Sequence, residues 1–374
     1  MLEQPLVKGL IFHQLALLLS ASFMCLSVGN SCWLIMEHSL HYLKPYEQKH
    51  IIRVLAMMPI YAIVSFLSLV FHRQDVYLEL IRNCYEAFVI ASFFTLMCHY
   101  VAPTLHQQKE YFRNVQPKPW IFPLNRVKVP RSGLTWFNII YAGINQFCIT
   151  RPLFALIAIV TESQGRYCGS STRPENGSLW ITLLQGACVL IAMYCVVQFY
   201  MQLKEDLASH EPALKVLCIK LVMFLVFWQT WLLGMLSREK GPLQPSARLA
   251  ALDIRVGIPS VLICFEMTLF AILHHWAFPW RPYDLDRQLR GPDRPEAYAH
   301  SPFEAFLDAL NPWDYAKAAA RGLRWLFHGV HHRMNDSSYH FNSALSQKTG
   351  VDAASNAPVP KVRTGTCSDP GPRD

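Results

Sequence analysis

Charged side chains inside apolar runs are the groups in this chain that could bind a polar ligand. The stretch IRNCYEAFVIASFF at residues 81–94 carries Arg82 and Glu86, four residues apart. On a helix this spacing puts both side chains on one face, where they can form an ion pair. A charge at mid-bilayer costs about 2.5–3.5 kcal/mol on insertion scales, so such a helix turns it toward protein or a water-filled cavity. This pattern predicts a central helix of a bundle, unless the pair lies at the headgroup boundary and only fixes helix depth.

A second charged position interrupts the apolar run at residues 136–160, where Arg151 precedes Pro152. Proline inside a helix frees a backbone carbonyl one turn earlier, and an arginine within the bilayer needs an anionic partner or ligand. Glu86 and Glu266 are the two carboxylates placed deepest in apolar runs. We expect at least one of them to face Arg151. The arginine is then either half of a structural ion pair or a cationic binding point inside a kinked helix.

The candidate ligand-binding side chains are all polar and all lie within apolar runs. They are Arg82, Glu86, Asn145, Arg151 and Glu266. The run at residues 214–236 adds Lys220 and Gln229. Lys220 can either pair with Glu266 or extend its amine to the membrane surface, since it lies only a turn or two into its helix.

Catalytic and metal-binding patterns are absent from the sequence. It has no nucleophile elbow, Walker loop, dinucleotide fingerprint or zincin motif. The pairs His38/His41 and His274/His275 have no carboxylate or thiolate set at the spacing of a metal site. Most of the eleven cysteines lie in apolar runs, where they are small core residues rather than a disulfide framework. We therefore expect no enzyme activity, no cofactor and no metal.

The composition is that of a membrane protein. Of the 374 residues, 52% are hydrophobic and 16% are charged, against about 25% charged in a soluble domain. Seven apolar runs are each close to the ~20 residues that a bilayer requires. They are residues 10–36, 51–71, 77–101, 136–160, 179–203, 214–236 and 257–278. The sequence predicts an all-α polytopic membrane protein, with seven transmembrane helices in residues 1–285 and a cytoplasmic tail.

Lysine and arginine in the connections predict the orientation. The connections at 37–50 and 102–135 and the segment after 279 are rich in them, whereas 161–178 is poor and 237–256 is an exception. This distribution favours an outside amino terminus. It also explains the net charge of +8 through basic loops beside an anionic leaflet, without nucleic acid. Asn176, in an Asn-Gly-Ser sequon, is then outside, where glycosylation requires it.

The tail has two predicted parts. In residues 286–334, apolar side chains recur at helical spacing over 313–330, which is typical of a helix lying in the cytoplasmic interface or packed on the bundle. Residues 335–374 are dominated by Ser, Asn, Pro, Gly and Thr, so we expect them to be disordered.

Five ordered stretches resemble one protein family. They are HYLKPYEQKHIIRVLAMMPIYAI at 41–63, IRNCYEAFVIASFF at 81–94, QFCITRPL at 146–153, KVLCIKLVMFLVFWQ at 215–229 and ICFEMTLFAILHHWAFPWRPY at 263–283. Together they resemble the organic solute transporter alpha-subunit and transmembrane protein 184 group, and the chain is more similar to the 184 branch. The resemblance implies seven helices with an outside amino terminus. For the transporter branch it also implies carriage of organic anions such as sterol conjugates, together with a single-span beta subunit.

Two functions fit these observations. The first is facilitative transport of amphipathic organic anions or sterol-like solutes, whose apolar body would lie along aromatic side chains while the anionic end meets an arginine. Without a proton relay or a nucleotide motif, such flux would be passive. The alternative is a non-transporting receptor or an organiser of vacuolar or endosomal membranes. The expected partners are the lipid bilayer and the solute, in the plasma membrane or an endosomal or vacuolar membrane; a homo-oligomer or a single-span partner subunit stays open.

Overall fold

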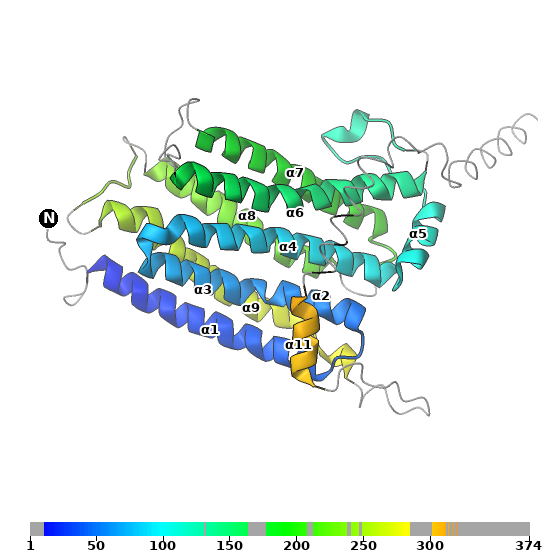
Figure 1. Ribbon diagram of the computed structural model, residues 1–374, viewed down its shortest axis with the longest axis horizontal. Coiled ribbons are helices and arrows are strands. Elements are labelled where there is room, and N and C mark those ends of the chain that lie inside the picture. Colours follow the sequence, from blue (N-terminus) through cyan, green and yellow to red (C-terminus); the bar gives the residue numbers. More distant parts are fainter. Residues whose placement is uncertain are drawn as a thin grey trace, which may run out of the picture. The chain divides into compact units, whose positions relative to one another are not determined.

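The computed structural model describes most of the membrane domain and a little of the tail. The described residues are 11–130, 132–163, 177–207, 212–237, 241–246, 249–284, 301–311, 313, 317 and 320. They form helices and connections, and their one β-bridge, between Ser246 and Leu249, is isolated. The long helices lie side by side (Figure 1). The prediction of an all-α fold is therefore confirmed for this part of the chain.

The long helices follow the predicted apolar runs closely. They are α1 (Phe12–Leu40), α2 (Pro45–Leu55), α3 (Met57–Val70), α4 (Asp75–Val101), α6 (Gly133–Ser163), α7 (Gly177–Leu203), α8 (Pro212–Leu236) and α9 (Ile258–Ala277). The largest difference is at α2 and α3, which together begin six residues before the predicted 51–71 and are separated at Ala56. Pro59 explains the separation, because its ring lacks an N–H and crowds the carbonyl four residues earlier, that of Leu55.

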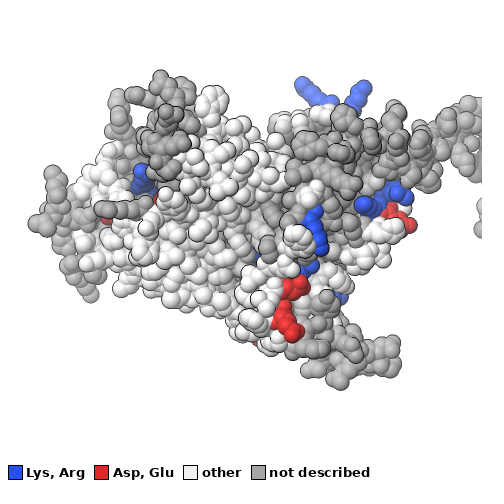
Figure 2. All heavy atoms as spheres, viewed as in Figure 1, with Lys and Arg blue, Asp and Glu red and all other residues white. Residues whose placement is uncertain are grey.

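Six helical segments are long enough and apolar enough to cross a membrane. They are Phe12–Leu40, Pro45–Val70, Tyr77–Val101, Gly133–Thr161, Leu183–Leu203 and Asp253–Ala277. α8, with 25 residues, is not among them, so the number seven stays a prediction. In Figure 2, uncharged residues cover the middle of the visible face, and the charged residues lie toward its two ends. On α1, Leu18, Leu26 and Trp33 are each more than half exposed, as expected for a lipid-facing stripe.

Helix packing sets the order of the bundle. α9 packs against α1, α3 and α8, and from α3 the packing continues through α4 and α6 to α7. The amino-terminal ends of α1 and α9 lie together, since His13 Nδ1 is 3.3 Å from Asp253 Oδ1. Asp253 belongs to a single π-helical turn, Asp253–Gly257, that precedes α9.

A short helix, α5 (Leu105–Asn114), lies in the connection where the prolines exclude a long one. Thr104 caps it, accepting a hydrogen bond from the Gln107 backbone N–H while the Gln107 side chain accepts one from the Thr104 N–H. At its end, Phe112 stacks on Phe137 of α6 with ring centroids 4.0 Å apart. The ring of Phe112 is fully buried, so α5 is part of the core and not a free loop.

Two glutamines on α7 hold the rest of this connection. The Gln202 side chain accepts from Lys118 N–H (2.7 Å) and donates to the Gln116 carbonyl (3.0 Å). One turn earlier, Gln198 accepts from Ile121 N–H and donates to the Pro119 carbonyl. Each amide thus satisfies one donor and one acceptor of an extended segment, which explains why two nearly buried glutamines occur in an apolar helix.

Gly133 permits the close approach of α5 to α6. A Cβ placed there would meet the backbone carbonyl oxygens of Val115 and Phe112, which cannot rotate away. We expect Gly133→Ala to lower the free energy of unfolding by about 1–3 kcal/mol through overpacking. Thermal unfolding in detergent measures this. Gly186→Ala is the matched control, because no atom lies within 4 Å of its added methyl group, and an unfolding temperature equal in the two variants would contradict the assignment.

The first tail helix, α11 (Pro302–Leu310), runs across the ends of α1 and α2 rather than along them (Figure 1). Ala305 and Ala309 are buried beneath it, and the Tyr42 hydroxyl donates to Asp308 Oδ2 at 2.8 Å. This helix precedes the predicted interfacial helix at 313–330. Of that segment only Trp313, Lys317 and Ala320 are described, so the interfacial helix, like the disorder of 335–374, lies outside the described residues.

Candidate functional site

The candidate site is built around the guanidinium of Arg151 on α6. Its Nη2 donates to Glu86 Oε2 at 3.1 Å and to Asn83 Oδ1 at 3.0 Å, both on α4. Its Nη1 donates to Gln185 Oε1 on α7 at 3.0 Å. The side chains of the ion pair are only 14% and 13% exposed. One buried cation therefore joins three helices, and the expectation that a deep carboxylate faces Arg151 is confirmed.

The guanidinium is not saturated by these contacts. The Nε of Arg151 is buried and has no hydrogen-bond partner among the described residues. The ring of Phe147, one turn earlier on α6, lies 5.8 Å from the guanidinium carbon. A buried N–H without an acceptor is costly in a low-dielectric region. One charge-assisted donor of the site is therefore left without an acceptor in the part of the chain that the structure describes.

Arg82 has a different partner from the one that its spacing predicted. Its guanidinium lies 3.8 Å from Glu79, three residues earlier, and 6.0 Å from the ring centroid of Tyr61 on α3. Residues three and four apart both share a helix face, so the spacing alone allowed either carboxylate. Glu86 is turned to α6, where Arg151 binds it. The predicted Arg82–Glu86 pair is therefore wrong, and Glu79, whose side chain is 54% exposed, takes that place.

Asn145 lies deeper in α6 and is 3% exposed. Its Nδ2 donates to the carbonyl of Tyr141, one turn earlier on the same helix, at 2.9 Å. Arg151 lies six residues further along the same helix. Its neighbour Gln146 does join two helices, because its Nε2 donates to the Cys188 carbonyl on α7 at 2.9 Å. The structure thus assigns these amides to the α6 backbone and the α6–α7 contact, and a ligand role for Asn145 stays a prediction.

Glu266 stands apart from the Arg151 network. It lies on α9, and its Oε2 is buried without a hydrogen-bond partner in the described part of the chain. The side chain of Lys220 and the sequon residue Asn176 both lie outside the described residues, so the alternatives proposed for them stay predictions.

Comparison with known proteins identifies the family. A family model described as organic solute transporter Ostalpha matches residues 16–283. The chain belongs to this family. A transmembrane protein 184 homolog of Dictyostelium discoideum is 31% identical over 287 residues, which are 76% of this chain and 55% of that protein. The chain thus spans about half the length of this relative. No solved structure matches the chain.

Membership of the Ostalpha family and the apolar helices together make this a multi-pass membrane protein. The whole Arg151 network falls inside the matched residues 16–283. Sequence reasoning missed Gln185 in this network and gave no role to Asn83. The signal was present, because an amide within an apolar run needs a partner, but the run alone does not say which helix supplies it.

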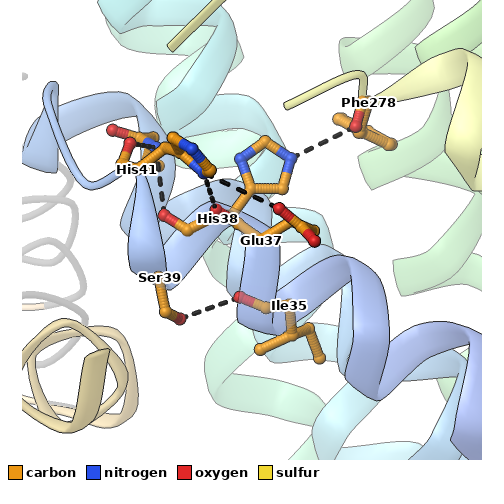
Figure 3. Close-up of polar contacts among 7 residues, drawn as sticks. Ile35, Glu37, His38, Ser39, His41 and Phe278 are labelled. Atoms are coloured by element: carbon orange, nitrogen blue, oxygen red, sulfur yellow. Dashed lines mark hydrogen bonds and ion pairs between the residues drawn. The ribbon is translucent and has the colours of Figure 1, made fainter. Parts of the chain in front are cut away.

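The histidine pairs have structural partners in this Ostalpha-family chain. His38 Nε2 lies 3.2 Å from the Phe278 carbonyl beyond α9, and His41 Nδ1 lies 2.9 Å from the Glu37 carbonyl (Figure 3). His274 Nδ1 lies 2.6 Å from the Phe270 carbonyl. The His38 contact ties the end of α1 to the end of α9, and the other two lie within α1 and α9. Among the described residues, no group of three or more His, Cys, Asp or Glu side chains is placed to hold a metal ion.

Proposed function

We propose that this protein is a facilitative transporter of amphipathic organic anions or sterol-like solutes. The observation that carries the proposal is the buried Arg151 guanidinium, which is shared by α4, α6 and α7 and retains an unpartnered Nε. Family membership supports the transporter class. The relative's name specifies no solute, so the substrate class rests on the arginine and its apolar surroundings.

Ion-pair exchange gives the proposed mechanism. Glu86 neutralises Arg151 in the empty protein, so the cation is tolerated within the membrane. An incoming sulfate or carboxylate competes with Glu86 for the guanidinium and also accepts from Nε, which has no acceptor among the described residues. Asn83 and Gln185 hold the arginine in place meanwhile. Because no step consumes a nucleotide or converts the solute, the flux is passive and bidirectional, and the compound leaves unchanged.

Counterflow into proteoliposomes tests the proposal. Vesicles containing the purified protein are loaded with an unlabelled steroid sulfate, and uptake of the labelled compound is followed. Unlabelled solute inside is expected to produce a transient accumulation above equilibrium, and protein-free vesicles are the control. Saturable binding without counterflow would favour the receptor or membrane-organiser function instead. Chromatography of the accumulated compound tests whether it is unchanged, since conversion would indicate an enzyme.

We further propose that the chain crosses the membrane seven times, with its amino terminus outside. The contact between His13 and Asp253 supports the number of crossings, because it places the starts of α1 and α9 at one end of the bundle. Two helices begin on the same side of the membrane only if the chain crosses it an even number of times between their starts. The first and the seventh span meet this condition. This favours α8 as a span, since without it α9 would be the sixth crossing and would begin at the opposite end.

Protease protection of terminal tags in sealed vesicles measures this topology. The amino-terminal and carboxyl-terminal tags are expected on opposite sides, with the tail cytoplasmic. Both tags on one side would indicate six spans and would contradict the crossing by α8. A tail digested only from the outside would contradict the orientation.

A further inference from the structure

The inward face of α8 ends in a polar side chain, Gln229, that is buried. Lys215, Cys218, Val222 and Gln229 are all buried and recur every three, four and seven residues, so they form one face of the helix. Gln229 is 9% exposed, yet both its Nε2 and its Oε1 lack hydrogen-bond partners among the described residues. An amide without partners inside a membrane bundle is costly, and such a group is commonly kept for a ligand.

Glu266 lies away from the sides of α9 that contact α1 and α3. Its neighbour Phe265 contacts Phe23 of α1 with ring centroids 5.3 Å apart, and the Cys264 thiol donates to the Ala62 carbonyl of α3. Successive helical residues are rotated by about 100°, so Glu266 lies about 100° from the side of α9 that contacts α1 and about 200° from the side that contacts α3. The remaining close neighbour of α9 is α8.

The two polar side chains lie at the same depth. The connection 237–257 joins the end of α8 to the start of α9, and the two helices pack against each other. Lys215 Nζ, near the start of α8, lies 5.8 Å from the ring centroid of Phe278, just after α9. Gln229 lies fourteen residues after Lys215, and Glu266 lies twelve residues before Phe278. At 1.5 Å per residue, both are roughly 18–21 Å from that contact. Three polar atoms that have no hydrogen-bond partner among the described residues therefore lie at one level on two neighbouring helices, which are not those of the Arg151 network.

The types of these atoms select the ligand. Nε2 of Gln229 can only donate, whereas Oε1 of Gln229 and an ionised Glu266 can only accept. A sulfate or carboxylate would be repelled by Glu266, and a metal ion would leave Nε2 without an acceptor. A hydroxyl group can accept a hydrogen bond from Nε2 of Gln229 and donate one to Glu266, so it can bond to both residues.

We propose that Gln229 and Glu266 form a binding site for an alcohol hydroxyl on the apolar body of the solute. The proposal rests on the proposed transport function and narrows its substrate class to hydroxylated amphipathic anions. The site lies in the α8–α9 contact, whereas Arg151 binds the anionic end from α6. Gln229 is then a specificity-determining residue, retained at a cost to the stability of the empty protein.

Two steroid sulfates that differ by a single hydroxyl group test this site. The measured quantity is the preference for the hydroxylated compound, as a ratio of counterflow Vmax/KM and as a ratio of dissociation constants for the purified protein. Gln229→Leu and Glu266→Gln are each expected to lower this preference about tenfold, the equivalent of one or two hydrogen bonds. Leu232→Ala, at a 51% exposed position one turn away on α8, is the control that retains the preference.

The outcomes separate this proposal from the proposed function. An unchanged preference in both variants would overturn the site and leave ordinary water as its occupant. If the wild-type protein binds the pair with the expected preference but shows no counterflow, transport fails and the hydroxyl site stands. Thermal unfolding without ligand gives a further readout: Gln229→Leu should raise the unfolding temperature, because it removes an unpartnered amide. A lowered temperature would assign the glutamine a structural role and refute the proposal.

Discussion

Arg151→Lys is expected to reduce solute counterflow at least tenfold in a protein that still reaches the membrane. The guanidinium bonds three side chains on two other helices at 3.0–3.1 Å and presents a further N–H at Nε. The ammonium of lysine keeps the charge, but it is a compact point charge and lacks the planar fork of donors of a guanidinium. It therefore cannot bind Glu86, Gln185 and a substrate anion at once. Initial counterflow rates in proteoliposomes, normalised to folded protein, measure the effect. Arg255→Lys is the matched control, since Arg255 is exposed.

Arg151→Ala separates binding from structure. It leaves Glu86 buried without its cation, which costs about 3–5 kcal/mol unless the carboxyl becomes protonated or hydrated. If the variant fails to reach the membrane and Arg151→Ala/Glu86→Ala restores it, the arginine is only half of a structural pair. If the single variant both folds and transports normally, Arg151 is neither binding point nor structural centre, and the proposed mechanism is wrong. Loss of flux in a folded single variant supports the mechanism.

The sequence predicted this network in part, for a physical reason. A buried arginine requires an anion, and a chain with few charges in its spans offers few candidates, so Glu86 and Glu266 could be named as the candidate partners of Arg151 before the structure. The choice between Glu79 and Glu86 for Arg82 could not be made, because both share its helix face. That choice depends on how α4 is rotated against α6, which is set by packing between helices and not by the pattern of either one.

Amide partners were harder to predict than ionic ones. Gln185, Gln198 and Gln202 all lie on α7, yet the first binds Arg151 and the other two bind the backbone of the connection before α6. An amide accepts and donates, so its type does not select its partner. The spans themselves were predictable because apolar length is a local property. α5 and α11 were not, since short helices depend on caps and on tertiary contacts.

Arg53→Met is expected to release α11 from the bundle. Arg53, on α2, is 3% exposed, and its Nε and Nη2 donate to the carbonyls of Ala309 and Asn311 at 2.6 and 2.8 Å. These carbonyls lie at the carboxyl-terminal end of α11, where helix carbonyls lack intrahelical partners and the dipole favours a cation. Hydrogen bonds to a charged group contribute about 1.5–3 kcal/mol each, more than a nine-residue helix gains from its own propensity. Methionine keeps the apolar stem and removes every donor.

Cross-linking measures the release of α11. A cysteine cross-link between α2 and α11, in a background without other accessible cysteines, reports whether the helix still lies against α2. Limited proteolysis after residue 284 gives an independent rate. Arg53→Met should accelerate cleavage at least tenfold, and Tyr42→Phe, which removes the single hydrogen bond to Asp308, should have a smaller effect. Arg113→Met, at an exposed position on α5, is the control.

If cleavage is equally slow in Arg53→Met and the control, the burial of Ala305 and Ala309 is sufficient to hold α11, and Arg53 serves the interior of α2 alone. If cleavage accelerates while counterflow is unchanged, the tail helix is anchored by Arg53 but takes no part in transport.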